Sequence, residues 1–144
     1  MQLIPVGKVR SHWSRIGEAP KQGRETDVPS ALEVFETFEA ALEGLANMQT
    51  LVVLTWFDRA DREILRVHPR GDRSEPLRGV FSTRSPHRPN PIGLHVVDVL
   101  RISGNRIEVR GMDALDGTPI LDIKPWLKNL DAPEAKASAS PPDR

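Results

Sequence analysis

The sequence predicts a single all-β domain, a mainly antiparallel β-barrel with one or two short helices. A chain of 144 residues has the length of one domain. Its apolar runs are short, rich in β-branched residues and separated by turn-forming residues. Strands do not alternate with helices, and no Gly-x-Gly-x-x-Gly motif follows the first strand, which argues against a Rossmann fold.

The expected strands follow from these apolar runs. Thr50 to Phe57 is a continuous β-branched and aromatic run, typical of a buried strand. Residues 103–105, Ser-Gly-Asn, separate two apolar runs and predict a hairpin turn. The other expected strands are residues 3–9, 31–35, 63–69, 93–102, 106–112 and 118–126.

One short helix is expected in residues 37–48. Phe38, Leu42 and Leu45 recur there at helical spacing, and Thr37 is a suitable N-cap. Residues 131–144 are small, polar and Pro-rich, which predicts an unstructured tail after a barrel domain in residues 1–130. No run approaches the roughly 20 apolar residues of a membrane helix, and the N-terminus lacks a signal-peptide pattern, so a cytoplasmic protein without membrane contact is expected.

Charge is distributed unevenly along a chain whose net charge is zero. Residues 59–88 contain eight basic and four acidic residues, and every one of these bases is arginine. One interpretation is a solvated face with scattered ion pairs. The other is a surface that meets an anion, because the arginine fork matches phosphate and carboxylate. The absence of cysteine excludes a thiolate nucleophile and Cys-ligated zinc.

A proline-rich loop, Gly79 to Gly93 (GVFSTRSPHRPNPIG), is the first candidate binding segment. Its three prolines fix φ and restrict the residues before them, so little backbone entropy is left to lose on binding. Gly93 permits a sharp exit or a close approach of a ligand. The alternative interpretation is a surface linker. The polar side chains that the loop presents are Arg84, His87, Arg88 and Asn90.

Two further segments carry candidate groups. In residues 111–126, Asp113, Asp116 and Asp122 are able to receive ribose hydroxyls or a ligand amine. Asp116 precedes a glycine and is equally a turn signal, whereas Asp122 fits the outer side of a strand or a partner of Lys124. No histidine lies nearby, so no metal site is expected. Residues 18–25 form a turn-rich loop able to close over a ligand, and His12, His68 and His95 lack metal-like spacing and are interpreted as structural or surface residues.

Together these segments resemble one family. Residues 78–97 (RGVFSTRSPHRPNPIGLHVV) and 111–126 (GMDALDGTPILDIKPW) closely resemble the TsaA-like (YaeB-like, TrmO-like) domain. Residues 5–11 and 19–23 match the opening of that family, so the resemblance covers about residues 3–130. The family includes S-adenosylmethionine-dependent methyltransferases that act on N6-threonylcarbamoyladenosine in tRNA.

The resemblance implies a small β-barrel that dimerises and binds S-adenosylmethionine near the subunit interface. It also implies tRNA as the partner, with Arg84, His87, Arg88 and Asn90 facing the acceptor or the RNA. The acceptor nitrogen must lose a proton, and the candidate bases are His87 and Asp113. The residues assigned to the cofactor by this resemblance are Gln22, Gly23, Phe57, Asp58, Arg84, Leu94, Asp113, Ala114, Leu115 and Asp116.

Two alternatives remain open from the sequence. The first is a methyltransferase of the same fold that acts on a small molecule, which the neutral net charge favours. The second is a non-catalytic domain that senses S-adenosylmethionine. The RNA enzyme differs from both in the salt dependence of its activity, because binding that depends on phosphate contacts weakens steeply with salt.

Overall fold

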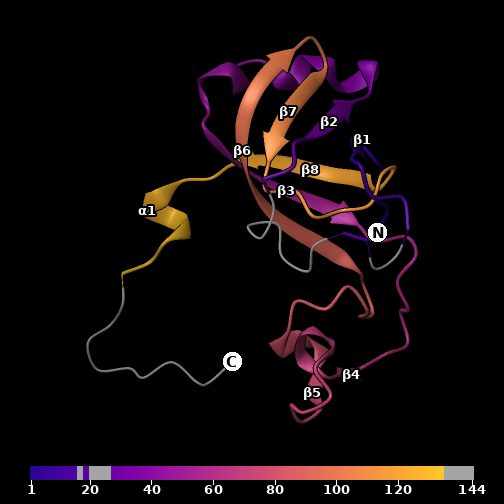
Figure 1. Cartoon of the computed structure of the whole chain (residues 1–144). Coiled ribbons are helices and arrows are strands. Elements are labelled where there is room, and N and C mark those ends of the chain that lie inside the picture. Colours follow the sequence, from indigo (N-terminus) through magenta and orange to yellow (C-terminus); the bar gives the residue numbers. More distant parts are fainter. Residues whose placement is uncertain (16–17, 20–26, 135–144) are drawn as a thin grey trace.

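The structure is a computed structural model that describes residues 1–15, 18–19 and 27–134 of the chain (Figure 1). Strands dominate it, and its helices are short. In chain order the elements are β1 (Gly7–Arg10), β2 (Ser30–Val34), the 3₁₀ helices η2 (Glu36–Leu42) and η3 (Leu45–Asn47), β3 (Thr50–Trp56), β4 (Arg66–Val67), η4 (Pro69–Gly71), β5 (Arg78–Gly79), η5 (Val80–Ser82), β6 (Ile92–Ser103), β7 (Arg106–Arg110), β8 (Pro119–Pro125) and α1 (Lys128–Asp131).

Six strands close a barrel in the order β1-β2-β7-β6-β3-β8, and every neighbouring pair is antiparallel (Figure 1). The barrel closes between β1 and β8, where Gly7 lies opposite Ile120. The predicted all-β, mainly antiparallel barrel is therefore confirmed. Closure leaves the barrel sheet without a free edge, which protects it from pairing with other chains.

The barrel interior is filled by alternate residues of its strands, as a pleated strand requires. In β3, Leu51, Val53 and Thr55 are buried while the residues between them are partly exposed. In β6, Gly93, His95 and Val97 point inward and Leu94 points outward. The core members are Val9, Leu32, Val34, Leu51, Val53, Val97, Ile107, Val109, Met112, Ala114 and Ile120.

The segment predicted as one helix, residues 37–48, is helical but divided in two, and the predicted cap is wrong. The segment forms two 3₁₀ helices, η2 and η3, and the residue at the N-cap of η2 is Phe35 rather than Thr37. Gly44, with φ of 88°, interrupts the segment, so neither part has the length that favours an α-helix. Phe38, Leu42 and Leu45 still pack against the core, as their spacing indicated.

Two predicted strands differ most from their expected bounds. The first begins at Gly7 rather than at Leu3, because its ladder with β8 starts only where the Val6 N–H donates to the Ile120 carbonyl. Of residues 63–69, only Arg66 and Val67 form a strand, and this strand pairs with β5 in a separate two-stranded sheet.

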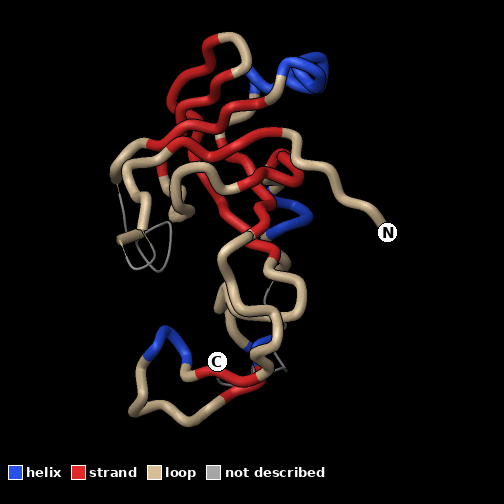
Figure 2. Tube along the Cα trace, turned by 90° about the vertical axis from the view of Figure 1, so that its right-hand side faces the viewer, coloured by secondary structure: helices blue, strands red, loops and turns tan. Residues whose placement is uncertain are grey.

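Residues 64–82, called the arm below, contain β4, η4, β5 and η5. In both views the two-stranded sheet of the arm lies away from the barrel (Figures 1 and 2). Most of its side chains are exposed, including Leu65, Leu77 and Phe81. The arm therefore adds surface rather than core.

The last strand ends at Pro125, and one turn of helix, α1, follows it. Residues 135–144 of the expected tail lie outside the described residues, whereas Asp131 is the last residue of α1. Within the described part of the chain, none of the helices has the length and apolarity to cross a membrane.

Candidate functional site

Side chains from β3 and β6 meet inside one end of the barrel. The rings of Phe57 and His95 contact edge to face, with centroids 5.8 Å apart and planes at 79°. Gly93 lies against them, since a Cβ at this position would come within 2.5 Å of Phe57 Cζ and would also collide with Thr55 Oγ1. The groups that approach Gly93 closely are the protein's own Thr55 hydroxyl and Phe57 ring, and the expected approach of a ligand stays a prediction.

A chain of hydrogen bonds leads from this end of the interior to the connection between β7 and β8. Thr55 Oγ1 lies 2.7 Å from His95 Nε2, and His95 Nδ1 lies 2.5 Å from Asp113 Oδ1. Thr55 is fully buried and His95 is 4% exposed. His95 is therefore structural, as one of the two interpretations held, but it also holds a candidate site residue, which the sequence analysis did not predict.

The loop from Asp113 to Asp116 is tied to the segment that follows β1. Ser11 Oγ donates to the Ala114 carbonyl at 2.9 Å, and the Ser11 N–H donates to Asp116 Oδ1 at 3.1 Å. The Asp116 N–H donates to the Trp13 carbonyl at 2.6 Å. The next residue, Gly117, has a φ of 84°, so the turn interpretation of Asp116 is confirmed while its ligand role stays a prediction.

The other members of this segment are held by burial or by contacts within the protein. Ala114 is fully buried, and the Leu115 carbonyl accepts the Thr118 hydroxyl at 2.6 Å. Asp122 pairs with Lys124 at 2.8 Å, as one of its two interpretations held. The hydrogen bond and charge of Asp122 raise the pKa of Lys124 above its ordinary value. Asp122 thus belongs to the outer surface of β8.

Arg88 holds the proline-rich loop in shape. Its guanidinium donates to the carbonyls of Val80 at 2.8 Å, of Ser85 at 2.9 Å and of Thr83 at 3.1 and 3.2 Å. These carbonyls belong to η5 and to the start of the loop, so one cation ties the short helix to the loop that follows it. The expected contact of Arg88 with RNA stays a prediction, because its guanidinium is engaged within the loop here.

Residues that follow β3 fix the far side of the same loop. The Asp61 N–H donates to His87 Nδ1 at 3.0 Å. Arg62 donates from Nε to the Pro89 carbonyl at 2.7 Å and from its terminal nitrogen to Asn90 Oδ1 at 3.2 Å. Its guanidinium also lies 5.2 Å from the centre of the Trp56 ring. Asp61 and Arg62 were not among the predicted site residues.

The remaining predicted residues are more scattered. Within the described residues, Arg84 and Asp58 are exposed and make no hydrogen bond or ion pair. Leu94 is 47% exposed on the outer face of β6, whereas the neighbouring His95 points inward. Gln22 and Gly23 lie outside the described residues. Phe57 and Asp113 are the two predicted cofactor residues that the structure brings together, through His95.

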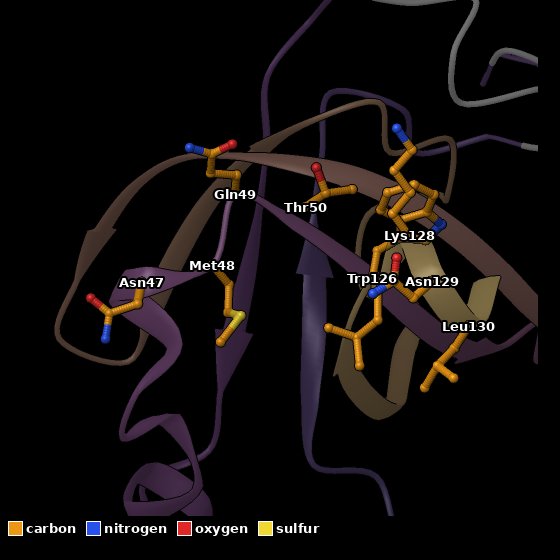
Figure 3. A pocket seen from close by; sticks show the side chains of 9 residues that line it. Asn47, Met48, Gln49, Thr50, Trp126, Lys128, Asn129 and Leu130 are labelled. Atoms are coloured by element: carbon orange, nitrogen blue, oxygen red, sulfur yellow. The ribbon is translucent and has the colours of Figure 1, made fainter. Parts of the chain in front are cut away.

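A groove lies at the end of β3 opposite the candidate site. It is an open groove of about 650 Å³ lined by Asn47–Thr50 and Trp126–Leu130 (Figure 3). Thr50 begins the strand that Trp56 ends, so the groove and the candidate site are about 20 Å apart. No predicted site residue lines this groove. Within the described ranges, no three His, Asp or Glu side chains gather as a metal site requires.

Replacing Arg88 by alanine is expected to lower the free energy of unfolding by about 2 kcal/mol, because several carbonyls would lose a charged donor. Urea denaturation followed by tryptophan fluorescence measures this loss. Arg84→Ala is the matched control and should change stability by less than about 0.5 kcal/mol. Equal stability of the two variants would show that the Arg88 contacts contribute nothing measurable.

A closed antiparallel sheet of six strands, with a rigid loop, an aromatic ring and a carboxylate at one end, places the chain in the class of small β-barrels. Residues 8–132 of the chain match the sequence pattern of one family, the N-terminal domain of tRNA-methyltransferase O. The chain belongs to this family, which confirms the resemblance seen in its motifs.

Relatives of known name support the same assignment. An S-adenosyl-L-methionine-binding protein of Archaeoglobus fulgidus is 46% identical over 131 residues, which are 91% of this chain and 93% of the relative. A probable S-adenosyl-L-methionine-binding protein of Methanothermobacter thermautotrophicus is 45% identical over 132 residues, 92% of this chain and 94% of the relative. S-adenosylmethionine, the expected cofactor, is thus the ligand in both names.

The fold is also that of solved structures. A crystal structure of TrmO from Pseudomonas aeruginosa matches with a TM-score of 0.75 at 34% sequence identity. The match covers 98% of this chain and 63% of that chain. The chain therefore spans less than two thirds of the solved protein, although it shares the barrel with it.

Proposed function

We propose that the chain is an S-adenosylmethionine-dependent methyltransferase whose cofactor binds at the barrel end formed by Phe57, the proline-rich loop and the Asp113–Asp116 loop. The observation that carries this proposal is the convergence of these segments, which are distant in sequence. Phe57 donates its N–H to the Pro91 carbonyl at 2.8 Å, and Asp113 reaches the Phe57 ring through His95. The names of the relatives supply the ligand.

A methyl sulfonium supplies an activated methyl group, so the protein has mainly to align the acceptor and exclude water. The prolines and Arg88 hold the loop rigid, which reduces the entropy lost when an acceptor is positioned. Gly93 lets the Phe57 ring pack directly on the strand, where it offers an apolar edge to an aromatic or aliphatic ligand group.

Asp113 is a better base than His87 for the proton that the acceptor nitrogen loses. In His87, Nδ1 accepts the Asp61 N–H, so a neutral ring carries its proton on Nε2 and has no free acceptor. In Asp113, Oδ1 accepts from His95, and no hydrogen bond within the described residues engages Oδ2. We therefore assign proton acceptance to Asp113 Oδ2.

We propose tRNA carrying threonylcarbamoyladenosine as the substrate. The side chains of four arginines of the arm and the adjoining loop make no hydrogen bond or ion pair within the described residues, and they leave their charges available to phosphate. Phe81 lies among them and is 84% exposed. Unstacked bases of single-stranded RNA stack on such aromatic rings. The four arginines are Arg66, Arg73, Arg78 and Arg84.

We further propose that the protein works in the cytoplasm, where its RNA substrate is. We also propose that two copies associate through the outer face of β6. Ile92 and Leu94 are 41% and 47% exposed on this face, beside the proposed site. A second copy that covered them would remove this apolar surface from water. A monomeric mass by light scattering at micromolar concentration would contradict the association.

The proposed function predicts two successive results for the purified protein. Calorimetric titration should show micromolar binding of S-adenosylmethionine, and labelled methyl should then pass to tRNA that carries threonylcarbamoyladenosine. Asp113→Asn should lower the rate of transfer at least about a hundredfold, in the range of general-base catalysis. The matched control is the same tRNA without the threonylcarbamoyl group.

The outcomes separate the rival functions. If the protein binds S-adenosylmethionine but no methylated product forms in any RNA pool, the non-catalytic sensor becomes the favoured function. If the protein methylates a small molecule and its activity does not depend on salt, the small-molecule methyltransferase becomes the favoured function. No binding by a folded protein would remove the methyltransferase proposal.

A further inference from the structure

We propose that His95 is a positioning residue for Asp113, and that the Thr55 hydroxyl satisfies the other ring nitrogen and so stabilises the tautomer in which His95 does this. The inference rests on the proposed function, since it concerns the carboxylate assigned above to the ligand site. It adds a second layer to that site, from two residues that were not among the predicted site residues.

Burial gives both ring nitrogens of His95 a single possible partner each. The residue is 4% exposed, and its ring contacts the Phe57 ring edge to face and lies against the Thr55 hydroxyl of β3. A buried polar atom without a partner is costly, so each nitrogen requires the contact that the structure gives it. Those partners are the Thr55 hydroxyl and the Asp113 carboxylate.

The chemistry of the partners sets the direction of the hydrogen bonds. An ionised carboxylate only accepts, so the proton between His95 and Asp113 belongs to Nδ1 of the ring. In the neutral ring Nε2 is then a bare acceptor, and the Thr55 hydroxyl donates to it. Thr55, His95 and Asp113 thus form a chain in which every donor has an acceptor.

The free end of this chain is the carboxylate. Hydroxyl, imidazole and carboxylate also form the Ser-His-Asp triad, where the hydroxyl is the exposed nucleophile. Here Thr55 is fully buried, whereas the Asp113 side chain is 19% exposed. The chain therefore works in the opposite sense, from an anchor in the barrel wall to a carboxylate at the ligand.

The anchor is rigid, and this gives it a function in positioning. Thr55 lies on β3 and His95 on β6, and the two strands pair along seven residues of β3. Asp113 lies on a connection outside the sheet. The bond from His95 holds Oδ1 against this frame and leaves Oδ2 as the oxygen that meets a ligand.

The test uses a matched pair of substitutions at His95. Asparagine places an N–H near the position of Nδ1, whereas leucine has a similar volume and no donor. His95→Leu is expected to weaken S-adenosylmethionine binding about tenfold or more in calorimetry, as the loss of a hydrogen bond to a charged group does. His95→Asn is expected to stay within about threefold of the wild type.

A spectroscopic readout tests the chain without any ligand. In protein labelled with ¹⁵N-histidine, NMR should show the His95 proton on Nδ1, with slow exchange that is lost in Asp113→Asn. Thr55→Val, which keeps the shape of the side chain, should move the ring away from this single state. A proton found on Nε2 of the free wild type would overturn the proposed direction of the chain.

The remaining outcomes are distinct. If the wild type binds S-adenosylmethionine and a folded His95→Leu binds equally well, His95 does not position the site, although the proposed function stands. If His95→Leu does not fold, Thr55→Val decides by the same two measurements. If the wild type does not bind, the proposed function fails, and this inference fails with it.

Discussion

Replacing Gly93 by alanine is expected to lower the free energy of unfolding by about 2 to 3 kcal/mol, near the upper end of what overpacking of a core costs. The added Cβ would meet the Phe57 ring at 2.5 Å and would also meet Thr55 Oγ1. Both groups lie in the barrel wall and have little room to move. Urea denaturation measures the loss.

The same substitution is expected to weaken S-adenosylmethionine binding about tenfold or more, because a displaced Phe57 ring no longer packs on His95. Gly79→Ala is the matched control at the other end of the loop. A Cβ there meets nothing within 4 Å, and its φ of −60° suits alanine. Gly79→Ala should leave stability unchanged or raise it by about 0.5 kcal/mol. Equal effects at both glycines would show that the loop tolerates no side chain at either end.

Removing three arginines of the arm together, Arg66→Ala, Arg73→Ala and Arg78→Ala, is expected to weaken tRNA binding roughly a hundredfold at 0.1 M salt. Each phosphate contact on a single strand contributes about 0.7 to the slope of log K against log salt, so the slope should fall by about 2. Filter binding over a range of salt measures both numbers. Binding of S-adenosylmethionine should not change.

A matched triple variant separates local from overall charge. Arg101, Arg106 and Arg110 lie on the barrel and pair with Glu108, Glu33 and Asp98. Replacing these three by alanine removes the same charge from a face away from the arm. If this triple weakens tRNA binding as much as the arm triple does, the arm is not the RNA surface.

The strands were predictable where a local pattern decides them. The run that begins at Thr50 forms β3, which ends at Trp56, one residue earlier than expected, and the turn at Gly104, with φ of 60°, joins β6 to β7. The register of β8 was not predictable. Ile120 and Ile123 both pack in the core although they lie three residues apart, because the ladder with β3 shifts between Leu54 and Thr55. Such a bulge breaks the alternation on which sequence patterns depend.

The loops of the site were predictable from the sequence, whereas the contacts of Thr55 and His95 behind Asp113 were not. The rigid loop and Asp113 were visible as unusual clusters of polar residues and prolines. His95 stood alone in an apolar strand, and a single histidine gives no partner by spacing. One signal was available, because Thr55 and His95 are polar residues at inward positions of two expected strands. The contacts of Arg88 depend on how the chain folds back and leave no pattern in the sequence.

The bonds from Asp61 and Arg62 to the proline-rich loop connect the base of the arm to the barrel end. An RNA that pulled on the arm would therefore strain the contact between Pro91 and Phe57. Thermodynamic linkage makes any such effect reciprocal: the factor by which RNA changes affinity for the methyl donor equals the factor by which the donor changes affinity for RNA. Once the methyl group had been transferred, loss of the spent donor would change the affinity for the RNA. Release of the product would then be coupled to methyl transfer through the side chains of His87 and Arg62.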